Sequence, residues 1–474
     1  MLTLMVIVFL LGYLAIALEH PLQINKAGTA LVTGVLLWVI YITMGADIVP
    51  IYNAGAFEYF LANNPAVLSL PLWDQCTRFI TDVQILEQLG EISETLFFLI
   101  GAMTIVELID VHGGFAIITN RIKTRRKTVL LWQIAFITFF MSAILDNMTT
   151  SIVMVMLIRK LIANYKERWV FASMIIIAAN SGGAWSPIGD ITTIMLWVKG
   201  NVTTTELIPA LILPCIVSVV IPMLIASRLL RGIITQNAKY KGEGEHFIGV
   251  TRQERMSIFF LGVGCLVFVP VFKTVTHLPP FMGIMLALGI MWIYTELMYS
   301  RKVCLEERYK HRVPQVLKRI DIPTVLFFLG ILLAVGTLQM TGILGAVAAY
   351  LDKTIHNVYI INLLIGLLSA VVDNVPLVAG AMGMYPLADP MTLGAAADPA
   401  YMANFVQDGV FWQFLAYCAG VGGSILIIGS VAGVVVMGIE RISFIWYLKN
   451  ISLMALCGYL AGAAVYILQV QLFM

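Results

Sequence analysis

Residues 142–147 read Ser-Ala-Ile-Leu-Asp-Asn, and residues 369–374 repeat the pattern as Ser-Ala-Val-Val-Asp-Asn. Each copy places a carboxylate and an amide inside otherwise apolar sequence. Holding an ionisable group inside a membrane is costly, so such a residue is a functional-site candidate by default. These two segments decide how the rest of the chain is organised, because each interrupts an apolar run long enough to enter a bilayer.

The composition indicates an integral membrane protein. The chain has 474 residues, 60% of them hydrophobic and 12% charged, with a mean hydropathy of +0.92. A soluble globular domain does not reach this balance, so we predict an all-α polytopic membrane protein. The net charge of +2 gives no indication of a nucleic-acid partner. The six cysteines form no CxxC pair and no HExxH motif occurs, so we expect no cofactor, no structural metal and no disulfide framework.

Apolar runs of about 20 residues predict the spanning helices. They cover residues 2–18, 27–44, 95–111, 207–227, 256–272, 281–299, 324–340 and 452–472. Residues 45–91 carry too much charge to span, and we expect an outer loop with interfacial helices there. The first run has no basic residue before it and no small-residue cleavage site after it, which predicts a retained helix rather than a signal peptide.

Two interruptions of the apolar pattern occur in each half of the chain. Residues 130–161 are broken by Asp146-Asn147, and their second arm is too short to cross comfortably, so we predict a helical hairpin that enters and leaves by the same side. Residues 171–198 predict a broken helix, because the three glycines and one proline within 180–190 cannot continue a regular helix. The counterparts are a hairpin around Asp373 and a helix over 411–439, broken at 420–424.

The basic residues predict the orientation. With the amino terminus outside, the outer segments hold four of the 29 Lys and Arg residues, namely Arg78, Lys199, Lys273 and Lys353, and the other 25 lie inside. The positive-inside rule strongly favours this topology.

The two halves echo each other three times in the same order. The pairs are residues 96–99 with 326–329 (Leu-Phe-Phe-Leu in both), 142–147 with 369–374, and 182–183 with 422–423 (Gly-Gly in both). We therefore predict a first repeat over 1–230, a cytoplasmic linker over 231–255 and a second repeat over 256–474. The halves start on opposite sides of the membrane, so the repeats are inverted. Paired hairpins and broken helices in inverted halves indicate a transporter binding site near the bilayer midplane.

The polar residues of these elements suit a small cation. Amide oxygens and freed backbone carbonyls replace a cation's hydration shell, and carboxylates supply compensating charge. The candidate amides are Asn147, Asn180 and Asn374, and the candidate carboxylates are Asp146, Asp190 and Asp373. Burial and neighbouring like charge favour the protonated carboxyl, so a proton would compete with the cation, and exchange would follow from mutual exclusion.

The halves differ in their acidic residues. Asp190 aligns with Ser430, which concentrates acid in the first half and places the main site there. Glu107 aligns with Thr337 and is followed one turn later by Asp110. Glu107 is a possible proton relay towards the cytoplasm, and equally a helix-end residue that contacts a basic loop.

The two tips have a simpler interpretation that is compatible with ion binding. Asp and Asn are good N-cap residues, so the tips could cap helices that start at Met148 and Val375. Ser424 and Ser430, taken singly, suit the close packing of helices.

The paired motifs, residues 142–150 with 180–193 and residues 369–377 with 420–433, resemble the ion transporter superfamily, and within it NhaD-type sodium/proton antiporters. The resemblance covers nearly the whole chain. It implies exchange of Na⁺ or Li⁺ for H⁺ in a bacterial inner membrane, by a homodimer with an elevator-like movement of the hairpin-bearing part. The residues to which it assigns ion or proton binding are Asp146, Asn147, Thr149, Asn180, Asp190, Asp373, Asn374 and Ser424. The second broken helix lacks an acidic counterpart to Asp190, which argues against a symmetric two-site mechanism.

Two other functions fit the sequence less well. The alternative is an anion or metalloid carrier of the same fold, for arsenite or a carboxylate. The dicarboxylate-carrying relatives have Ser-Asn-Thr at the tips, which suits anions, whereas this chain has Asp-Asn there. The predicted spans also contain no Lys or Arg that could bind an anion, which disfavours this alternative. An intramembrane protease with an Asp146–Asp373 dyad leaves the repeat and the glycine-broken helices without a role. We therefore expect a transporter and not an enzyme.

Overall fold

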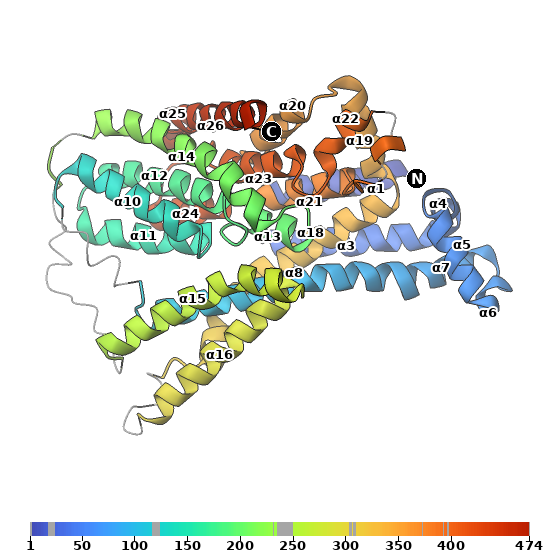
Figure 1. The fold of residues 1–474 in the computed structure, drawn as a ribbon, viewed down its shortest axis with the longest axis horizontal. Coiled ribbons are helices and arrows are strands. Elements are labelled where there is room, and N and C mark those ends of the chain that lie inside the picture. The colour runs from blue at the N-terminus through green and yellow to red at the C-terminus, as the bar shows by residue number, and fades with distance from the viewer. Residues whose placement is uncertain are drawn as a thin grey trace. The chain divides into compact units, whose positions relative to one another are not determined.

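The computed structural model describes residues 2–17, 24–115, 124–230, 232–234, 250–302, 306, 310–371, 373–391, 393–395 and 398–473. All elements in these ranges are helices, and strand pairing within them is limited to an isolated bridge between Arg126 and Ile233 (Figure 1). Among these described residues, seven helices are long and apolar enough to cross a membrane, or eight if one bent pair counts as a span. The predicted all-α polytopic class is confirmed, and the inverted repeat stays a prediction.

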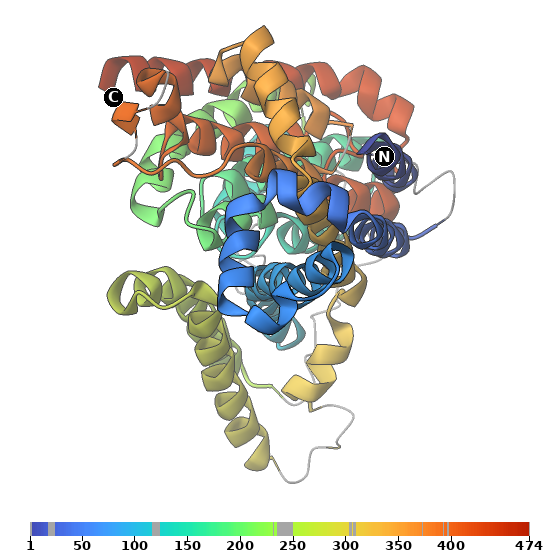
Figure 2. The same ribbon diagram turned by 90° about the vertical axis from the view of Figure 1, so that its right-hand side faces the viewer.

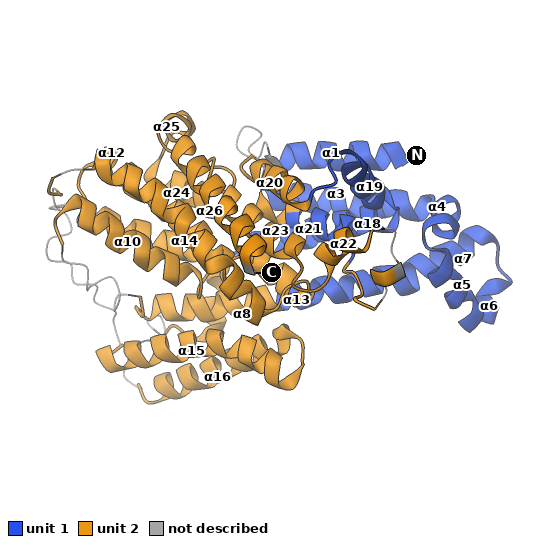
Figure 3. Cartoon of the chain, turned by 45° about the horizontal axis from the view of Figure 1, so that its top comes forward, with its two compact units in different colours: residues 1–97, 321–357, 378–386 blue, residues 98–320, 358–377, 387–474 orange. Residues whose placement is uncertain are grey.

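The chain folds into two compact units, coloured separately in Figure 3. Unit 1 consists of Met1–Phe97, Asp321–Asn357 and Val378–Pro386, and unit 2 of Phe98–Ile320, Val358–Leu377 and Leu387–Met474. Each unit draws on both predicted repeats. The compact units therefore do not coincide with the repeats. Most of the predicted linker, residue 231 and residues 235–249, lies outside the described residues, as do Leu18, Glu19-His20-Pro21 and Val372.

Unit 1 is built on two helices that approach closely. α3 (Lys26–Thr43) packs along α18 (Ile322–Met340), where a Cβ on Gly34 would lie 2.6 Å from the carbonyl oxygen of Gly330. α1 (Leu2–Ala17) lies beside α3 (Figure 2). The remaining short helices of this unit are α4 (Gly45–Tyr52), α5 (Ala54–Asn63), α6 (Pro65–Leu68) and α19 (Ile343–Thr354), the last of which the sequence did not predict.

The third predicted span is wrong at its start. α7 (Leu72–Phe79), the π-helical turn η1 (Ile80–Gln84) and α8 (Ile85–Val111) form one apolar helical segment of 40 residues, where an outer loop with interfacial helices was expected as far as Glu91. At 1.5 Å per residue such a helix is about 60 Å long, roughly twice the hydrocarbon thickness. Its charged first part can therefore extend beyond the membrane, because charge excludes burial in lipid but not helix formation.

Unit 2 holds the first predicted hairpin, both broken helices, and the first arm and tip of the second hairpin, whose second arm continues into unit 1 from Val378. Its first hairpin is α10 (Lys127–Ser142) with α11 (Asn147–Leu161), and its first broken helix is α12 (Tyr165–Ala184) with α13 (Ile191–Val198). The corresponding elements later in the chain are α20 (Val358–Ser369), the start of α21 (Asn374–Met384), α23 (Val410–Gly422) and α24 (Val431–Glu440). The other helices are α14 (Thr204–Leu229), α15 (Arg252–Thr276), α16 (Pro280–Ser300), α17 (Val313–Val316), α22 (Pro399–Met402), α25 (Phe444–Asn450) and α26 (Ser452–Phe473), with the 3₁₀ turns η4 (Leu317–Arg319), η5 (Leu393–Ala395) and η6 (Ala403–Phe405).

The arms of the hairpins are short. α10 has 16 residues and α11 has 15, so each is about 22–24 Å long, less than the hydrocarbon thickness of about 30 Å. This length is the one expected for arms that turn back inside the bilayer.

The helix breaks are shorter or later than the predicted segments. The irregular residues are 185–190, within the predicted 180–190, and 423–430, which overlap the predicted 420–424 only at 423–424. Gly182 and Gly183 lie within α12, Gly420 lies within α23, and Gly422 is the last residue of α23. These glycines serve close packing instead. A Cβ on Gly182 would collide with the carbonyl oxygen of Phe139, and one on Gly422 would collide with that of Gly366.

The sequence echoes correspond to equivalent contacts. The Ser142 hydroxyl donates to the carbonyl oxygen of Ala179 at 2.6 Å, and the Ser369 hydroxyl donates to that of Ala419 at 2.8 Å. In both halves, the serine at the end of the first hairpin arm thus bonds to the broken helix. The accepting carbonyl lies about one turn before the glycine, Gly182 or Gly422, at which the backbones of the two helices touch. The repeated residues are those that hold a hairpin against its broken helix.

We predict that Gly422→Ala destabilises the protein by about 1–3 kcal/mol, because the new methyl group overpacks a backbone contact. Gly438→Ala is the matched control: it lies in α24, and a Cβ there meets no atom within 4 Å. Thermal denaturation of the purified variants in detergent, followed by size-exclusion chromatography, measures the difference. Equal melting temperatures for both variants would contradict the packing role of Gly422.

Candidate functional site

Two carboxylates begin helices that start at the breaks in the apolar sequence. Asp146 is the N-cap of α11: its Oδ1 accepts a hydrogen bond from the Thr149 amide at 2.7 Å and its Oδ2 one from the Thr149 hydroxyl at 2.8 Å. Asp190 is the N-cap of α13, and its Oδ1 accepts from the amide and the hydroxyl of Thr192, both at 2.9 Å. The capping interpretation of the first tip is therefore correct, with α11 starting one residue earlier than expected.

Two further helices of the second half start at the same site. The Val375 amide donates to Asp373 Oδ1 at 3.4 Å where α21 begins. Ser430 caps α24 by accepting from the Gly433 amide at 3.2 Å. Four helix N-termini therefore carry three aspartates and one serine.

Asp190 is the centre of the polar network. Its side chain is buried, at 1% exposure, and its Oδ2 accepts a hydrogen bond from Asn147 Nδ2 at 2.6 Å. Asn374 Nδ2 lies 3.5 Å from each of its carboxylate oxygens. The amides of both tips thus meet on one buried carboxylate, and this contact joins residues more than 180 positions apart in the sequence.

Asn180 extends the network across the two halves. Its Oδ1 accepts from Asn147 Nδ2 at 3.1 Å, and its Nδ2 donates to the hydroxyls of Ser424 at 3.0 Å and Ser430 at 2.9 Å. All of these side chains are buried. The Tyr447 hydroxyl donates to the carbonyl oxygen of Ser424 at 2.8 Å and so fixes the second break from outside the network.

The structure brings most of the predicted site residues together. Asn147, Asn180, Asp190, Asn374 and Ser424 share hydrogen bonds, directly or through one intermediate. Asp146 with Thr149, and Asp373, are partly exposed at the adjoining helix N-termini. Within the described part of the chain, no three His, Cys, Asp or Glu side chains are grouped so as to hold a metal ion. A cation here would need amide, hydroxyl and carbonyl oxygens as well as carboxylates.

Glu107 contacts a basic residue, as expected if it is a helix-end residue beside a basic loop. Its Oε1 lies 2.7 Å from Nε of Arg319, and its side chain is 24% exposed. Arg319 ends the basic loop of residues 301–319, so Glu107 contacts that loop from the last turns of α8. A relay role for Glu107 stays a prediction.

Sequence reasoning missed two members of the network. Thr192 donates twice to Asp190, and Ser430, which the sequence indicated only for packing, both caps a helix and accepts from Asn180. The spacing Asp-x-Thr at 190–192 is a capping pattern and could have indicated Thr192.

The charges of the site nearly balance. Each helix N-terminus contributes about +0.5 charge, so four contribute about +2, whereas three ionised aspartates contribute −3. The net charge is about −1 when all three carboxylates are ionised. The arrangement therefore suits either one monovalent cation or one proton.

Comparisons with known proteins were made for the whole chain. A family model described as a citrate transporter (CitMHS) matches residues 13–406. Sodium/proton antiporter 1 of Arabidopsis thaliana is 43% identical, over 98% of this chain and 72% of its own length. Sodium/proton antiporter 2 of the same plant is 39% identical, over 98% of both. The Na⁺/H⁺ antiporter NhaD of Alkalimonas amylolytica is 29% identical, over 97% of this chain and 89% of its own length.

We predict that Asn180→Ala costs about 1–3 kcal/mol of stability, because it leaves the buried partners of the amide unsatisfied. Asn450→Ala is the control, since Asn450 is exposed and bonds only within its own helix at Trp446. Chemical denaturation in detergent compares the two. A similar loss for both would show that Asn180 is not part of a buried network.

Proposed function

Because the chain belongs to the citrate transporter family and, within it, to the NhaD-type sodium/proton antiporters, we propose that it is a secondary transporter that exchanges Na⁺, and also Li⁺, for H⁺. The observation that carries the proposal is the buried carboxylate of Asp190, contacted by amides from both tips. A net site charge of about −1 is neutralised by one cation or by one proton. Binding of one therefore excludes the other.

The side-chain amides can interact either with the bare carboxylate or with a bound cation. Rotation of an Asn side chain by 180° exchanges its N–H donor for its oxygen acceptor. With the N–H groups towards Asp190, Asn147 and Asn374 stabilise the carboxylate; with the oxygens turned inward, they offer ligands to a hard cation. The same residues thus serve both forms without covalent chemistry.

Alternating access requires that the site be reachable from either side of the membrane in turn. Asn147 and Asn374 belong to hairpins that we predict to insert from opposite sides, so movement at one tip or the other would open one route at a time. The expected homodimer, the elevator-like movement and the periplasmic amino terminus belong to this proposal. So does the bacterial inner membrane, although the relatives include plant as well as bacterial proteins.

A carboxylate carrier is the second candidate, favoured by the citrate transporter description of the family model. Helix N-termini attract anions, and four of them converge here. The three aspartates oppose this function, because an anion would enter a site that already carries about −1 charge. Uptake of labelled citrate without cation-dependent proton flux would favour the carboxylate carrier over the Na⁺/H⁺ antiporter.

We predict that Na⁺ or Li⁺ dissipates a preformed pH gradient in everted vesicles that contain the protein, and that Asp190→Asn reduces this exchange at least 100-fold. Asp146→Asn and Asp373→Asn should also abolish it. Glu58→Gln, an exposed change in α5, should behave like the wild type. Full exchange by Asp190→Asn, or a wild-type protein indifferent to both ions, would contradict the proposal.

Competition also predicts the pH dependence of exchange. When the protein binds either one proton or one Na⁺, lowering the pH by one unit should raise the KM for Na⁺ by up to about tenfold, at unchanged maximal rate. Initial rates over a range of Na⁺ concentrations at several pH values measure both parameters. A maximal rate that falls with pH while KM stays constant would indicate separate cation and proton sites.

A further inference from the structure

Glu440 is a buried carboxylate far along the chain from the predicted site residues. It is the last residue of α24, and its side chain is 1% exposed. The position is unfavourable in two ways: the C-terminus of a helix repels negative charge, and burial of a carboxylate is costly unless it is paired. A glutamate at this position therefore needs positively charged or hydrogen-bond-donating partners from neighbouring segments.

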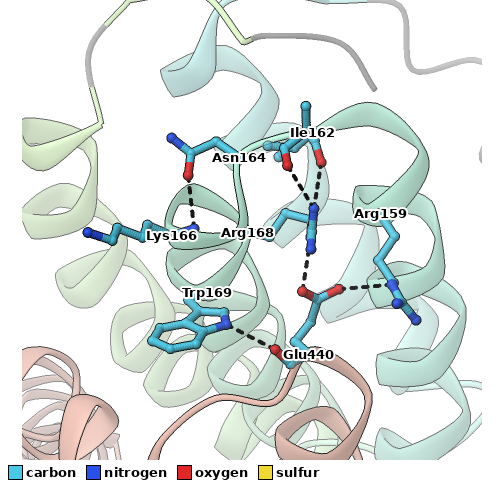
Figure 4. Close-up of polar contacts among 8 residues, drawn as sticks. Arg159, Ile162, Asn164, Lys166, Arg168, Trp169 and Glu440 are labelled. Atoms are coloured by element: carbon cyan, nitrogen blue, oxygen red, sulfur yellow. Dashed lines mark hydrogen bonds and ion pairs between the residues drawn. The ribbon is translucent and has the colours of Figure 1, made fainter. Parts of the chain in front are cut away.

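Two arginines and a tryptophan supply that compensation (Figure 4). Arg168 Nε lies 2.9 Å from Glu440 Oε2, and Arg159 Nε lies 3.4 Å from Oε1. Trp169 Nε1 donates to the backbone carbonyl oxygen of Glu440 at 3.0 Å. Arg168 also donates through Nη1 to the carbonyl oxygens of Ile162 and Ala163, at 3.1 and 3.0 Å. The Glu440 cluster, Arg159, Arg168, Trp169 and Glu440, thus joins the end of α11, the loop that follows it and the start of α12 to the end of α24.

The two helices that the cluster joins both begin at the ion site. α11 starts after its N-cap Asp146 and carries Arg159 in its last turn, and α24 starts after its N-cap Ser430 and ends at Glu440. The helices pack along each other. An ion pair between their C-terminal ends therefore fixes how far one can slide past the other, and so fixes the relative positions of their N-terminal caps.

The equivalent helix end of the first half holds a glycine where Glu440 stands in the second. The offset of 240 residues that relates Asp190 to Ser430 also relates Gly200 to Glu440 and Arg168 to Asp408. There, Gln407 Nε2 donates to the Gly200 carbonyl oxygen at 2.8 Å, and Asp408 accepts from the amide and hydroxyl of Thr203 at 2.6 and 2.8 Å. At each helix end, the broken helix of one half is therefore bonded to the segment that leads into the broken helix of the other half. The buried carboxylate with two arginines belongs to the α24 end.

We propose that Glu440 is a positioning residue for the ion site, acting through α11 and α24 to hold the N-terminal caps Asp146 and Ser430 in the register that binds the cation. This role rests on the proposed Na⁺/H⁺ exchange. Loss of the ion pair lets α11 shift along α24, which weakens cation binding while the carboxylates that exchange cation and proton stay intact.

The test is Glu440→Gln in the full-length protein, with two independent readouts. In vesicles, the KM for Na⁺ should rise roughly tenfold while the maximal rate changes less than about twofold, in the range found for mutations that alter coupling between distant sites. In detergent, hydrogen exchange of backbone amides 147–151 should be faster than in the wild type, although these residues lie at the opposite end of α11. Arg159→Gln, which removes the longer of the two ion pairs to Glu440 and changes a side chain that is 40% exposed, should give a smaller change in the same direction. It also tests the proposal if Glu440→Gln does not fold.

Glu167→Gln is the matched control. Glu167, near the start of α12, pairs with Lys127 of α10 at 2.9 Å, so its ion pair joins α12 to α10. It should leave the KM for Na⁺ and the exchange of residues 147–151 unchanged. An unchanged KM and unchanged hydrogen exchange in Glu440→Gln, or equal effects of Glu167→Gln, would overturn the positioning role. A wild-type protein without Na⁺-dependent exchange would refute the proposed function instead, and the hydrogen-exchange comparison would then decide the positioning role alone.

Discussion

The structure depends on one buried carboxylate that must be satisfied. Asp190 is held by the amide and hydroxyl of Thr192 and by the side-chain amides of Asn147 and Asn374, from three separate segments. A carboxylate at this depth is tolerated only with such partners. The partners reach it only if two hairpin tips come within hydrogen-bonding distance of a broken helix, which explains why backbones touch at Gly182 and Gly422.

The asymmetry between the halves sets the net charge of the proposed ion site. The second half repeats the contacts of the first but has Ser430 where the first has Asp190, so the helix caps contribute three negative charges rather than four. With four aspartates the site would carry about −2, which one monovalent cation or one proton would not neutralise. With serines throughout it would attract anions, as the citrate transporter description suggests for other members of the family.

Much of this arrangement could be predicted from the sequence, and the failures have physical causes. Polar residues in apolar runs, glycine clusters and short arms located both hairpins and both breaks. The individual contacts were harder to predict: Asn147 rather than Asp146 bonds to Asp190, because an amide N–H donates to a carboxylate whereas two ionised carboxylates can only accept. Glu440 had no local signal, since its partners lie on helices more than 250 residues earlier. The continuous helical segment from Leu72 was missed because its charged residues indicated an outer loop with separate interfacial helices, whereas charge excludes burial in lipid but not the extension of a spanning helix beyond the membrane.

In the proposed exchange, one Na⁺ and one proton compete for the carboxylate network around Asp190. This competition can be measured by adding Na⁺ to the purified protein in weakly buffered detergent solution and recording the protons released for each ion bound. We predict release of about one proton per Na⁺ at a pH where the site is protonated, and none from Asp190→Asn. Saturable Na⁺ binding by the wild type without proton release at any pH would rule out the competition.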